Sequence, residues 1–228
     1  MICIIPARKG SKRIKNKNIV NFFGKPILTH VIENLKKSRN FEHIIVSTNS
    51  MKIAKIAEEK KVNVFFRDEK LSGDLIDTKS VIIDVLKNSK LTKKTKNDKI
   101  MCVYPCSVFL KTNHINMALK KLNINTSFVF SAKKFNHPIE RSFILDKNNK
   151  VKLKDKLQIG LNTQSFAQSY HDAAQFYLGW KKSWLKNKTF FDKKSKFILF
   201  EHLEAHDIDN PEDLDIAKKI WKINQKST

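Results

Sequence analysis

Short apolar runs alternate with amphipathic segments along the first 131 residues, and this alternation constrains the fold more than any other feature of the chain. Short apolar runs bounded by polar residues are typical of strands buried on both faces of a parallel sheet. They predict strands at 2–5, 44–46, 62–66, 100–104 and 127–131. Because strands and helices alternate, the sequence predicts an α/β fold, with a mostly parallel, Rossmann-like sheet and helices on both of its faces.

Apolar spacing and capping residues predict the helices. Gly24-Lys25-Pro26 is expected to open the first one, with Pro26 in its first turn. Asn210 and Pro211 are the expected N-cap and first residue of the last one. Other helices are expected at 51–61, 77–88 and 113–122. The stretch 90–99 is the most polar of the chain and lacks periodicity, so it is expected to be an exposed loop.

After Ala132 the alternation ends. Residues 143–145 and 151–153 predict a hairpin around an Asp/Asn-rich turn. We therefore interpret about 133–175 as an excursion from the sheet, with strands again at 175–180 and 197–200. The length of 228 residues suits a single domain, 1–228, that includes this excursion.

Cysteine content and hydropathy limit the possible classes of protein. Cys3, Cys102 and Cys106 are odd in number and form no C-x-x-C motif, so we expect unpaired thiols in a reducing cytoplasm, without a disulfide framework or a zinc site. No apolar run reaches the roughly 20 residues that span a bilayer. The first residues lack the basic segment of a secretory signal, so we expect neither export nor membrane insertion.

The net charge of +23 also needs an interpretation. Nucleic-acid sites rely on arginine for bidentate and stacking contacts, but only five of the 45 basic residues are arginines, and the lysines are spread along the whole chain. We therefore expect a lysine-rich surface that attracts small anions, and no nucleic-acid partner.

A basic loop follows the first predicted strand. It runs Ala7-Arg8-Lys9-Gly10-Ser11-Lys12-Arg13 and continues to Lys17-Asn18. A glycine there lets the backbone approach an anion closely, and five cationic side chains suit a triphosphate. The loop matches neither a Walker motif nor G-x-G-x-x-G, which disfavours a P-loop NTPase or a dinucleotide enzyme. A solvated basic loop is the alternative reading.

Two further segments carry candidate chemistry. Asp207 and Asp209 point the same way in an extended segment, so they can share one Mg²⁺, although a carboxylate there also stabilises the N-terminus of the following helix. The segment Tyr170–Tyr177 is dense in polar donors that can hold a polyhydroxylated substrate, although a histidine beside an aspartate is more often structural.

Several motifs in order, between about residues 2 and 218, resemble the cytidylyltransferases that activate 2-keto sugar acids, the CMP-sialic acid synthetase type. The basic loop carries the resemblance together with Gly24-Lys25-Pro26, Ile45–Asn49, Phe66-Arg67, Leu71-Ser72, Asp77-Thr78, Tyr104–Leu110 and Asp207–Asp213. Within this family, Pro138–Arg141 and Tyr170–Tyr177 most resemble the branch that activates pseudaminic acid.

The resemblance implies that CTP and a nonulosonic acid react, with Mg²⁺, to give the CMP-sugar and pyrophosphate. It implies catalytic roles for Arg8, Lys12, Lys17 and Asp209, and a metal site on Asp207 and Asp209. The implied nucleotide-binding residues are Ala7, Gly10, Ser11, Asn18, Arg67, Thr78 and Ser80. The implied sugar-binding residues are Gln164, His171, Gln175, Tyr177 and Arg141, with Lys133 as a second candidate for the sugar carboxylate.

The excursion at about 133–175 resembles the family's dimerisation arm, which implies a homodimer whose active sites are partly roofed by the partner subunit. Several positions depart from the family pattern. Lys9 replaces the usual second glycine of the loop, and Lys15-Asn16 stands where a proline commonly precedes Lys-Asn. Asn162 and Ser165 stand where an arginine and an aspartate are usual. These departures leave open another sugar acid (legionaminic, sialic or 3-deoxy-octulosonic acid) or a non-catalytic nucleotide-binding relative.

Overall fold

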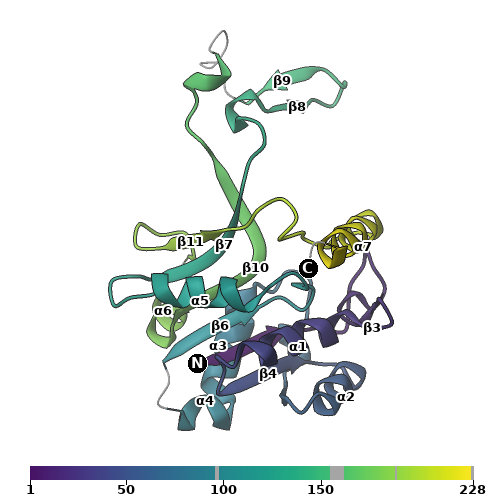
Figure 1. The fold of residues 1–228 in the computed structure, drawn as a ribbon, viewed down its shortest axis with the longest axis vertical. Coiled ribbons are helices and arrows are strands. Elements are labelled where there is room, and N and C mark those ends of the chain that lie inside the picture. The colour runs from purple at the N-terminus through teal and green to yellow at the C-terminus, as the bar shows by residue number, and fades with distance from the viewer. Residues whose placement is uncertain (96–97, 155–161, 188, 227–228) are drawn as a thin grey trace.

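The computed structural model describes residues 1–95, 98–154, 162–187 and 189–226 (Figure 1). Residues 155–161 of the predicted excursion and 96–97 of the predicted loop lie outside these ranges. Seven strands form the central sheet, in the order β11-β7-β10-β6-β1-β4-β5. They are β1 Ile2–Pro6, β4 His43–Thr48, β5 Asn63–Phe66, β6 Lys99–Val103, β7 Phe128–Lys134, β10 Tyr170–Trp180 and β11 Lys196–Leu199.

The pairing of these strands places six of the seven carboxyl ends at one edge of the sheet. β1 is parallel to β4 and β6, and β4 is parallel to β5. β10 runs antiparallel to both β6 and β7, and β11 is parallel to β7. The predicted mostly parallel α/β sheet is confirmed, and its carboxyl edge is the place where ligands bind in open sheets of this kind.

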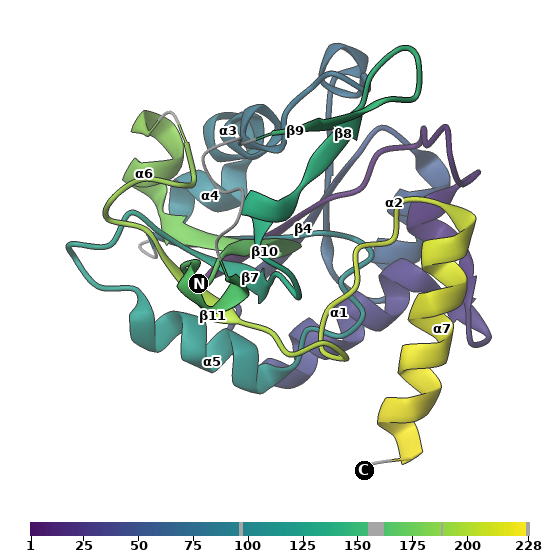
Figure 2. The same ribbon diagram turned by 90° about the horizontal axis from the view of Figure 1, so that it is seen from above.

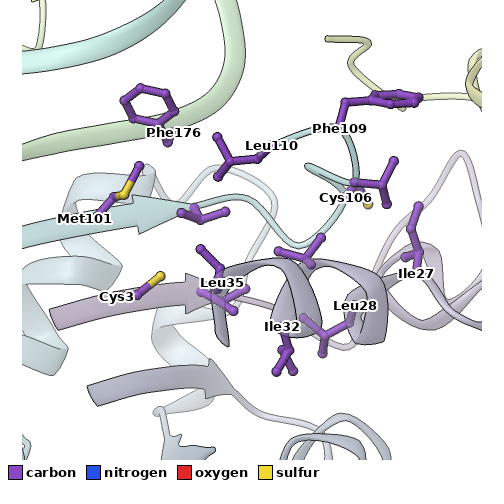
Figure 3. Packing of buried hydrophobic residues seen from close by; sticks show 14 of the residues in the cluster. Cys3, Ile27, Leu28, Ile32, Leu35, Met101, Cys106, Phe109, Leu110 and Phe176 are labelled. Carbon is purple, nitrogen blue, oxygen red and sulfur yellow. The ribbon is translucent and has the colours of Figure 1, made fainter. Parts of the chain in front are cut away.

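Helices cover both faces of the sheet (Figure 2). Their bounds are α1 Ile27–Ser38, α2 Met51–Glu59, α3 Thr78–Asn88, α4 Lys90–Lys94, α5 Thr112–Lys121, α6 Lys181–Lys186 and α7 Pro211–Lys226. On one face, apolar residues of α1, α2, α5 and α7 pack on strand residues such as Cys3, Met101 and Phe176 (Figure 3). On the other face, Ile82 of α3 and Trp184 of α6 belong to the second buried cluster.

β7 and β10 continue beyond the sheet as a two-stranded ribbon that projects from the body of the molecule (Figure 1). The ribbon leads to the predicted hairpin, β8 Phe143–Leu145 and β9 Val151–Leu153. We call the described residues between 133 and 171, outside the body, the arm. Phe143, Leu145 and Val151 of its hairpin are exposed.

The structure corrects two local predictions. Pro26 does not lie in the first turn of α1. Instead, Lys25–Pro26 forms strand β3, paired with β2 Asn21–Phe22, and α1 begins one residue later. The stretch 90–99 is not simply an exposed loop, because Lys90–Lys94 forms α4. Thr92 is fully buried there, and its hydroxyl donates to the carbonyls of Val85 and Leu86 at the end of α3.

Other expectations are confirmed with small shifts. Asn210 caps α7 by accepting a hydrogen bond from the Asp213 amide at 2.9 Å, and Pro211 is the first helical residue. β10 begins at Tyr170, five residues earlier than expected, and α6 was not predicted. The three cysteines are buried and unpaired, and burial raises the pKa of each thiol, that of Cys106 to about 12.

Candidate active site

A cavity of about 660 Å³ opens at the carboxyl edge of the sheet. It is formed by the basic loop, the segment between β5 and α3, the end of β6, the middle of β10 and the segment before α7. The residues that line it include Arg8, Gly10, Ser11, Lys12, Arg13, Lys17, Asn18, Arg67, Asp74, Thr78, Tyr104, Cys106, Ala174, Gln175, His206, Asp207 and Asp209. We refer to this cavity as the central pocket.

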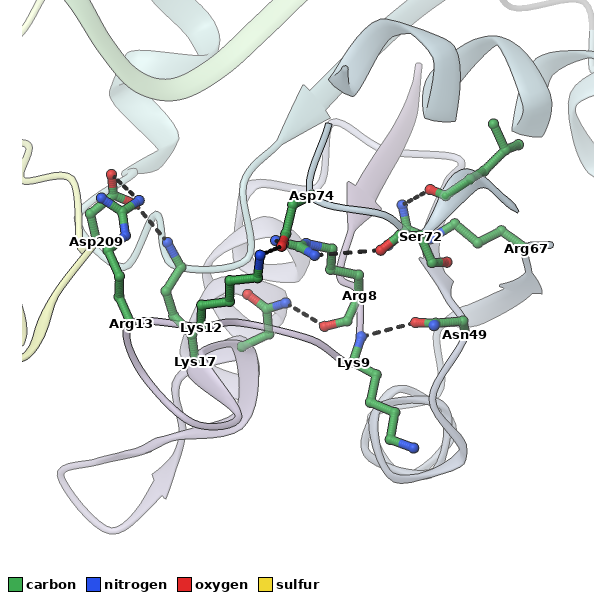
Figure 4. Close-up of polar contacts among 12 residues, drawn as sticks. Arg8, Lys9, Lys12, Arg13, Lys17, Asn49, Arg67, Ser72, Asp74 and Asp209 are labelled. Carbon is green, nitrogen blue, oxygen red and sulfur yellow. Dashed lines mark hydrogen bonds and ion pairs between the residues drawn. The ribbon is translucent and has the colours of Figure 1, made fainter. Parts of the chain in front are cut away.

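One carboxylate holds two cations of the basic loop at the pocket (Figure 4). Asp74 pairs with Arg8 at 2.5 Å and with Lys12 at 2.8 Å. Hydrogen bonds from Lys12 and Arg8 lower the pKa of Asp74. Arg8 also donates to the Ser72 carbonyl at 3.4 Å. The loop is thus fixed to the segment before α3, with its cations gathered over the pocket.

A second ion-pair group joins residues that are 192 positions apart (Figure 4). Lys17 pairs with Asp209 at 3.0 Å, and Arg13 pairs with the other oxygen of the same carboxylate at 2.8 Å. Burial by itself raises the pKa of Asp209, but Lys17 and Arg13 more than offset it, so the pKa lies below its ordinary value. The basic loop and the C-terminal acidic segment therefore meet at one site, as predicted.

Asp207 differs from Asp209 in its surroundings. The described residues give its carboxylate no hydrogen bond or ion pair, and it opens to the pocket. Burial in the protein, followed by repulsion from Asp209, raises its pKa although part of it is accessible to solvent. Two carboxylates that repel each other at the edge of this cavity are ligands of the type that a divalent cation takes, so the donor set is compatible with the predicted magnesium ion.

Arg67 has an unusual position at the other end of the pocket. Its side chain is only 7% exposed, and among the described residues neither Nε nor Nη2 has a hydrogen-bond partner. Nη1 makes one long contact, 3.5 Å to the Leu71 carbonyl. Burial and the charge of Arg8 lower the pKa of Arg67 to about 10. Buried unpaired donors are costly, so this guanidinium is set up for acceptors that a ligand supplies.

The start of α3 places two predicted nucleotide residues differently. Asp77 caps the helix, because its carboxylate accepts from the Ser80 amide at 2.9 Å and from the Ser80 hydroxyl at 2.7 Å. Ser80 is therefore engaged in the cap and does not line the pocket. Thr78 does line it, and its hydroxyl bonds with the Tyr104 hydroxyl at 2.9 Å.

Two predicted nucleotide-binding residues of the basic loop, Ala7 and Asn18, hold its backbone in place through hydrogen bonds. Ala7 is fully buried, and its amide donates to the Ser47 carbonyl at 2.9 Å. The side-chain Nδ2 of Asn18 donates to the Arg8 carbonyl at 2.9 Å. The side chain of Lys9 points away from the pocket, while its backbone amide is held by Asn49 (Figure 4). The replacement of a glycine by Lys9 thus leaves the pocket lining unchanged.

The predicted sugar residues do not gather in one place. Gln175 lines the central pocket, with its buried Oε1 unpaired among the described residues. Tyr177 lies in the core, where its ring stacks on Phe190 and its hydroxyl donates to Asp172. Gln164, His171 and Arg141 are outside the pocket. His171 packs against Phe135 with tilted rings at the base of the arm, Arg141 lies in a separate arm cavity, and Gln164 is exposed in a short 3-10 helix.

Lys133 is also committed elsewhere. It donates to the carbonyls of His202 at 3.3 Å and Ala205 at 3.0 Å, so it fastens the segment before Asp207 to the end of β7. Burial lowers its pKa. Lys133 therefore stabilises the position of the acidic segment through these hydrogen bonds and is not among the residues that line the pocket.

Sequence reasoning missed several pocket residues. Asp74, Tyr104, Ala174 and His206 were not among the predicted site residues, and each reaches the pocket through pairing of distant segments. Asp74 lies between two motifs of the family resemblance, Leu71-Ser72 and Asp77-Thr78. This position in the sequence is the one feature that could have identified it as a site residue. His206 directly precedes Asp207, and its buried Nε2 has no hydrogen-bond partner among the described residues.

The chain is similar to known proteins over nearly its whole length. A pseudaminic acid cytidylyltransferase of Campylobacter jejuni (strain 81-176) is 35% identical over 99% of this chain and 98% of its own. A CMP-N,N'-diacetyllegionaminic acid synthase of Legionella pneumophila is 30% identical over 100% of this chain and 98% of its own. A solved CMP:2-keto-3-deoxy-manno-octonic acid synthetase complexed with CTP shares the fold, with a TM-score of 0.70 at 11% identity over 98% of both chains.

No helix within the described ranges has the length and apolar character needed to cross a bilayer.

A family model described as cytidylyltransferase matches residues 2–227. This match and the identities above extend over nearly the whole chain, which agrees with a pocket that joins its two ends. The chain therefore belongs to the cytidylyltransferase family of nucleotidyltransferase enzymes.

Proposed function

We propose that this enzyme transfers the cytidylyl group of CTP to a nonulosonic acid, with pseudaminic acid as the first candidate, in a magnesium-dependent reaction in the cytoplasm. One observation carries the proposal: Arg8, Lys17 and Asp209 surround a single cavity although they come from opposite ends of the chain. The identity of 35% to a pseudaminic acid cytidylyltransferase supports the choice of sugar acid.

In the proposed reaction, the anomeric hydroxyl of the sugar attacks the α-phosphorus of CTP. A new P–O bond forms as the bond to the leaving pyrophosphate breaks, and the proton of the hydroxyl passes to solvent. Negative charge grows on the leaving group, and Arg8, Lys12 and Lys17 neutralise it. The triphosphate replaces Asp74 as the partner of Arg8 and Lys12, since these side chains already point into the pocket.

Asp207 and Asp209 would hold the magnesium ion. When bound, Mg²⁺ would neutralise phosphate charge and help to orient the reacting groups. Asp209 is held in place by Lys17 and Arg13, whereas the carboxylate of Asp207 is available, and its pKa is raised by burial and then by repulsion from Asp209, which a cation would relieve. Only Ile208 separates the two residues on the same extended segment, so their side chains point the same way and could bind one cation.

The nucleotide base is assigned to the end of the pocket at Arg67. The buried Nε and Nη2 of Arg67 need acceptors, and cytosine has two on one edge, the O2 carbonyl and the N3 ring nitrogen. A planar guanidinium fits such a pair of acceptors better than a lysine does. Gln175, which lines the same pocket from β10, is assigned to the acceptor sugar.

We also propose a homodimer, in which the arm of one subunit covers the pocket of the other. Three sugar-side predictions, Gln164, His171 and Arg141, would then serve the partner's site, because they lie on the arm or at its base. The exposed apolar hairpin supports this arrangement, since large unpartnered apolar faces mark interaction surfaces.

A related sugar acid is the second candidate, because a CMP-N,N'-diacetyllegionaminic acid synthase is also 30% identical over the whole chain. The test is a pyrophosphate-release assay with CTP and a panel of nonulosonic acids, with and without Mg²⁺, and with UTP as the nucleotide control. We expect the highest kcat/KM with pseudaminic acid. A higher value for another acid replaces the substrate assignment, and release with none of the acids contradicts the proposed function.

The metal assignment is tested in the same assay with Asp209→Ala. We expect this variant to lose at least about 100-fold in kcat, the scale of losses when an electrostatic contact to the reacting group is removed. Asp215→Ala is the matched control, an exposed aspartate of α7 that pairs with Lys218. Near-normal, Mg²⁺-dependent turnover of Asp209→Ala would remove Asp209 from the metal site.

A further inference from the structure

The pairing of β10 with β7 is interrupted where β10 passes the central pocket. This pairing shifts register between Asp172 and Tyr177, and Ala174 in the interruption has a left-handed backbone with φ of 50°. Residues other than glycine adopt this conformation rarely, and only where the surroundings stabilise it. Ala174 and Gln175, the two residues at this interruption, are also the residues of β10 that line the pocket.

Side chains replace the missing ladder bonds at this β-bulge. The Ser131 hydroxyl accepts from the amides of Gln175 at 2.9 Å and Phe176 at 3.3 Å. The Gln175 carbonyl accepts from the Ser107 hydroxyl at 2.9 Å and from the Tyr104 amide at 3.2 Å. The backbone of Gln175 is therefore held on both sides, by β7 and by the residues that follow β6.

Asp172 holds the left-handed residue itself. Its Oδ1 accepts from the Ala174 amide at 2.9 Å, and its Oδ2 accepts from the Tyr177 hydroxyl. Tyr177 is held in turn, because its ring stacks on Phe190 with centroids 4.1 Å apart and meets Tyr104 edge-on. Asp172 thus clamps both ends of the bulge, from Ala174 to Tyr177.

The clamp determines what Gln175 offers to the pocket. The Gln175 side-chain nitrogen donates to the Ala173 carbonyl at 2.8 Å, and a carbonyl can only accept, so the orientation of the amide is set. Oε1 is left as a buried acceptor that needs a donor. Because the Ala173 carbonyl belongs to the bulge, a change in the bulge turns or frees this amide.

We infer that Asp172 is a positioning residue for the acceptor substrate: with Tyr177, it holds the left-handed bulge at Ala174 so that Gln175 presents a hydrogen-bond acceptor to a hydroxyl or amide N–H of the sugar acid. This inference rests on the proposed function, and it assigns to Tyr177 a role through Asp172 in place of direct sugar contact. The triphosphate end of the pocket does not depend on the clamp.

The test compares the KM of the sugar acid with the KM of CTP. In Asp172→Ala, we expect the KM of the sugar acid to rise about tenfold, the size of one lost hydrogen bond, while the KM of CTP stays within about twofold. Asp172→Asn keeps an acceptor for the Ala174 amide and should stay within about threefold. Tyr177→Phe should follow Asp172→Ala in direction.

A rescue separates positioning from general damage to the fold. Glycine adopts a positive φ without strain, so Ala174→Gly added to Asp172→Ala should recover most of the lost sugar affinity. Equal rises in both KM values, or no recovery in the double variant, overturn the inference.

Hydrogen exchange gives a second measurement that needs no turnover. Exchange of the amides at 174–176 should become faster in Asp172→Ala and return toward the wild-type rate in Asp172→Ala/Ala174→Gly. Unchanged exchange in Asp172→Ala overturns the inference, even if the wild-type enzyme releases no pyrophosphate with any sugar acid and the proposed function has failed.

Discussion

At the scale of single residues, the central pocket contains polar groups that the folded chain leaves unpaired. The buried nitrogens of Arg67 and Oε1 of Gln175 are the clearest cases among the described residues. Natural proteins usually satisfy such groups, and exceptions cluster where a ligand completes the hydrogen bonding. The two residues face the pocket from different elements, with Arg67 after β5 and Gln175 within β10. At these positions, the unpaired groups therefore lower the stability of the ligand-free protein and at the same time favour ligand binding.

Replacement of Arg67 by Met tests this opposition. Without nucleotide, we expect Arg67→Met to melt about 2–4 °C higher than the wild type, because a buried unpaired guanidinium is removed and its volume is largely kept. With CTP at about 100 times the wild-type Kd, the wild type should gain about 2.7 kcal/mol and the variant much less. Thermal unfolding with and without CTP measures both effects.

The control for this experiment is Arg39→Met, an exposed arginine at the end of α1 that should keep the full response to CTP. A lower melting temperature for nucleotide-free Arg67→Met, together with an intact CTP response, would mean that Arg67 is a structural residue.

At the scale of elements, local caps and distant contacts cooperate. α5 begins with a side-chain contact in which His114 Nδ1 accepts from the Lys111 amide at 3.2 Å. The same ring packs on Phe200 with centroids 4.2 Å apart and faces Glu204 at 3.5 Å. The start of α5 is thereby tied to the segment that leads to the acidic pair. Burial lowers the pKa of His114, although Glu204 opposes the change.

The lowered pKa of His114 predicts a loss of stability in acid. Between the ordinary pKa of histidine and the lower folded value, the unfolded chain binds a proton that the folded chain does not, so acidification favours unfolding. We expect the unfolding free energy to fall from pH 7.5 to pH 5.5, and to fall less in His114→Asn, which keeps a capping acceptor but does not titrate. Urea unfolding at the two pH values measures the difference. Equal losses in both proteins would contradict the prediction.

At the scale of the whole molecule, the arm is the part that the body does not stabilise. The pairing of β8 with β9 puts Phe143 opposite Leu153 and Leu145 opposite Val151. Phe143 and Leu145 lie on one side of the hairpin, because alternate residues of a strand point the same way, and both are more than half exposed. An isolated two-stranded hairpin is only marginally stable in water, so we expect another protein surface to pack on this apolar face.

The double variant Phe143→Ser/Leu145→Ser tests the proposed homodimer. We expect sedimentation velocity to show a dimer for the wild type and a shift to monomer for the variant. The KM of the sugar acid should rise at least about fivefold, because the arm no longer covers the partner's pocket, a loss of about 1 kcal/mol. Ile124→Ser, at a residue 79% exposed outside the arm, is the control. A monomeric wild type, or a variant that stays dimeric, would contradict the proposal.

Most of the order of strands and helices, apart from β2, β3 and α6, could be predicted from the sequence, as could the cap at Asn210 and the position of the basic loop and acidic pair, because periodicity, capping and turn chemistry depend on near neighbours in the chain. α4 could not, because its buried Thr92 bonds to the end of α3, and a polar stretch carries no local sign of that burial. The pairing of Asp74 with Arg8, 66 positions away by residue number, depends on where two loops meet above the sheet.

Tertiary structure also decided the roles within one motif. The sequence placed His171, Gln175 and Tyr177 together on the sugar side, but the antiparallel insertion of β10 and its bulge separate them: Gln175 enters the pocket, Tyr177 the core and His171 the arm. The direction of each side chain depends on strand register and on the left-handed Ala174, and both are set by hydrogen bonds to β6 and β7. Residue types therefore determined the chemistry available to this protein, while long-range pairing determined which of those residues face the substrate.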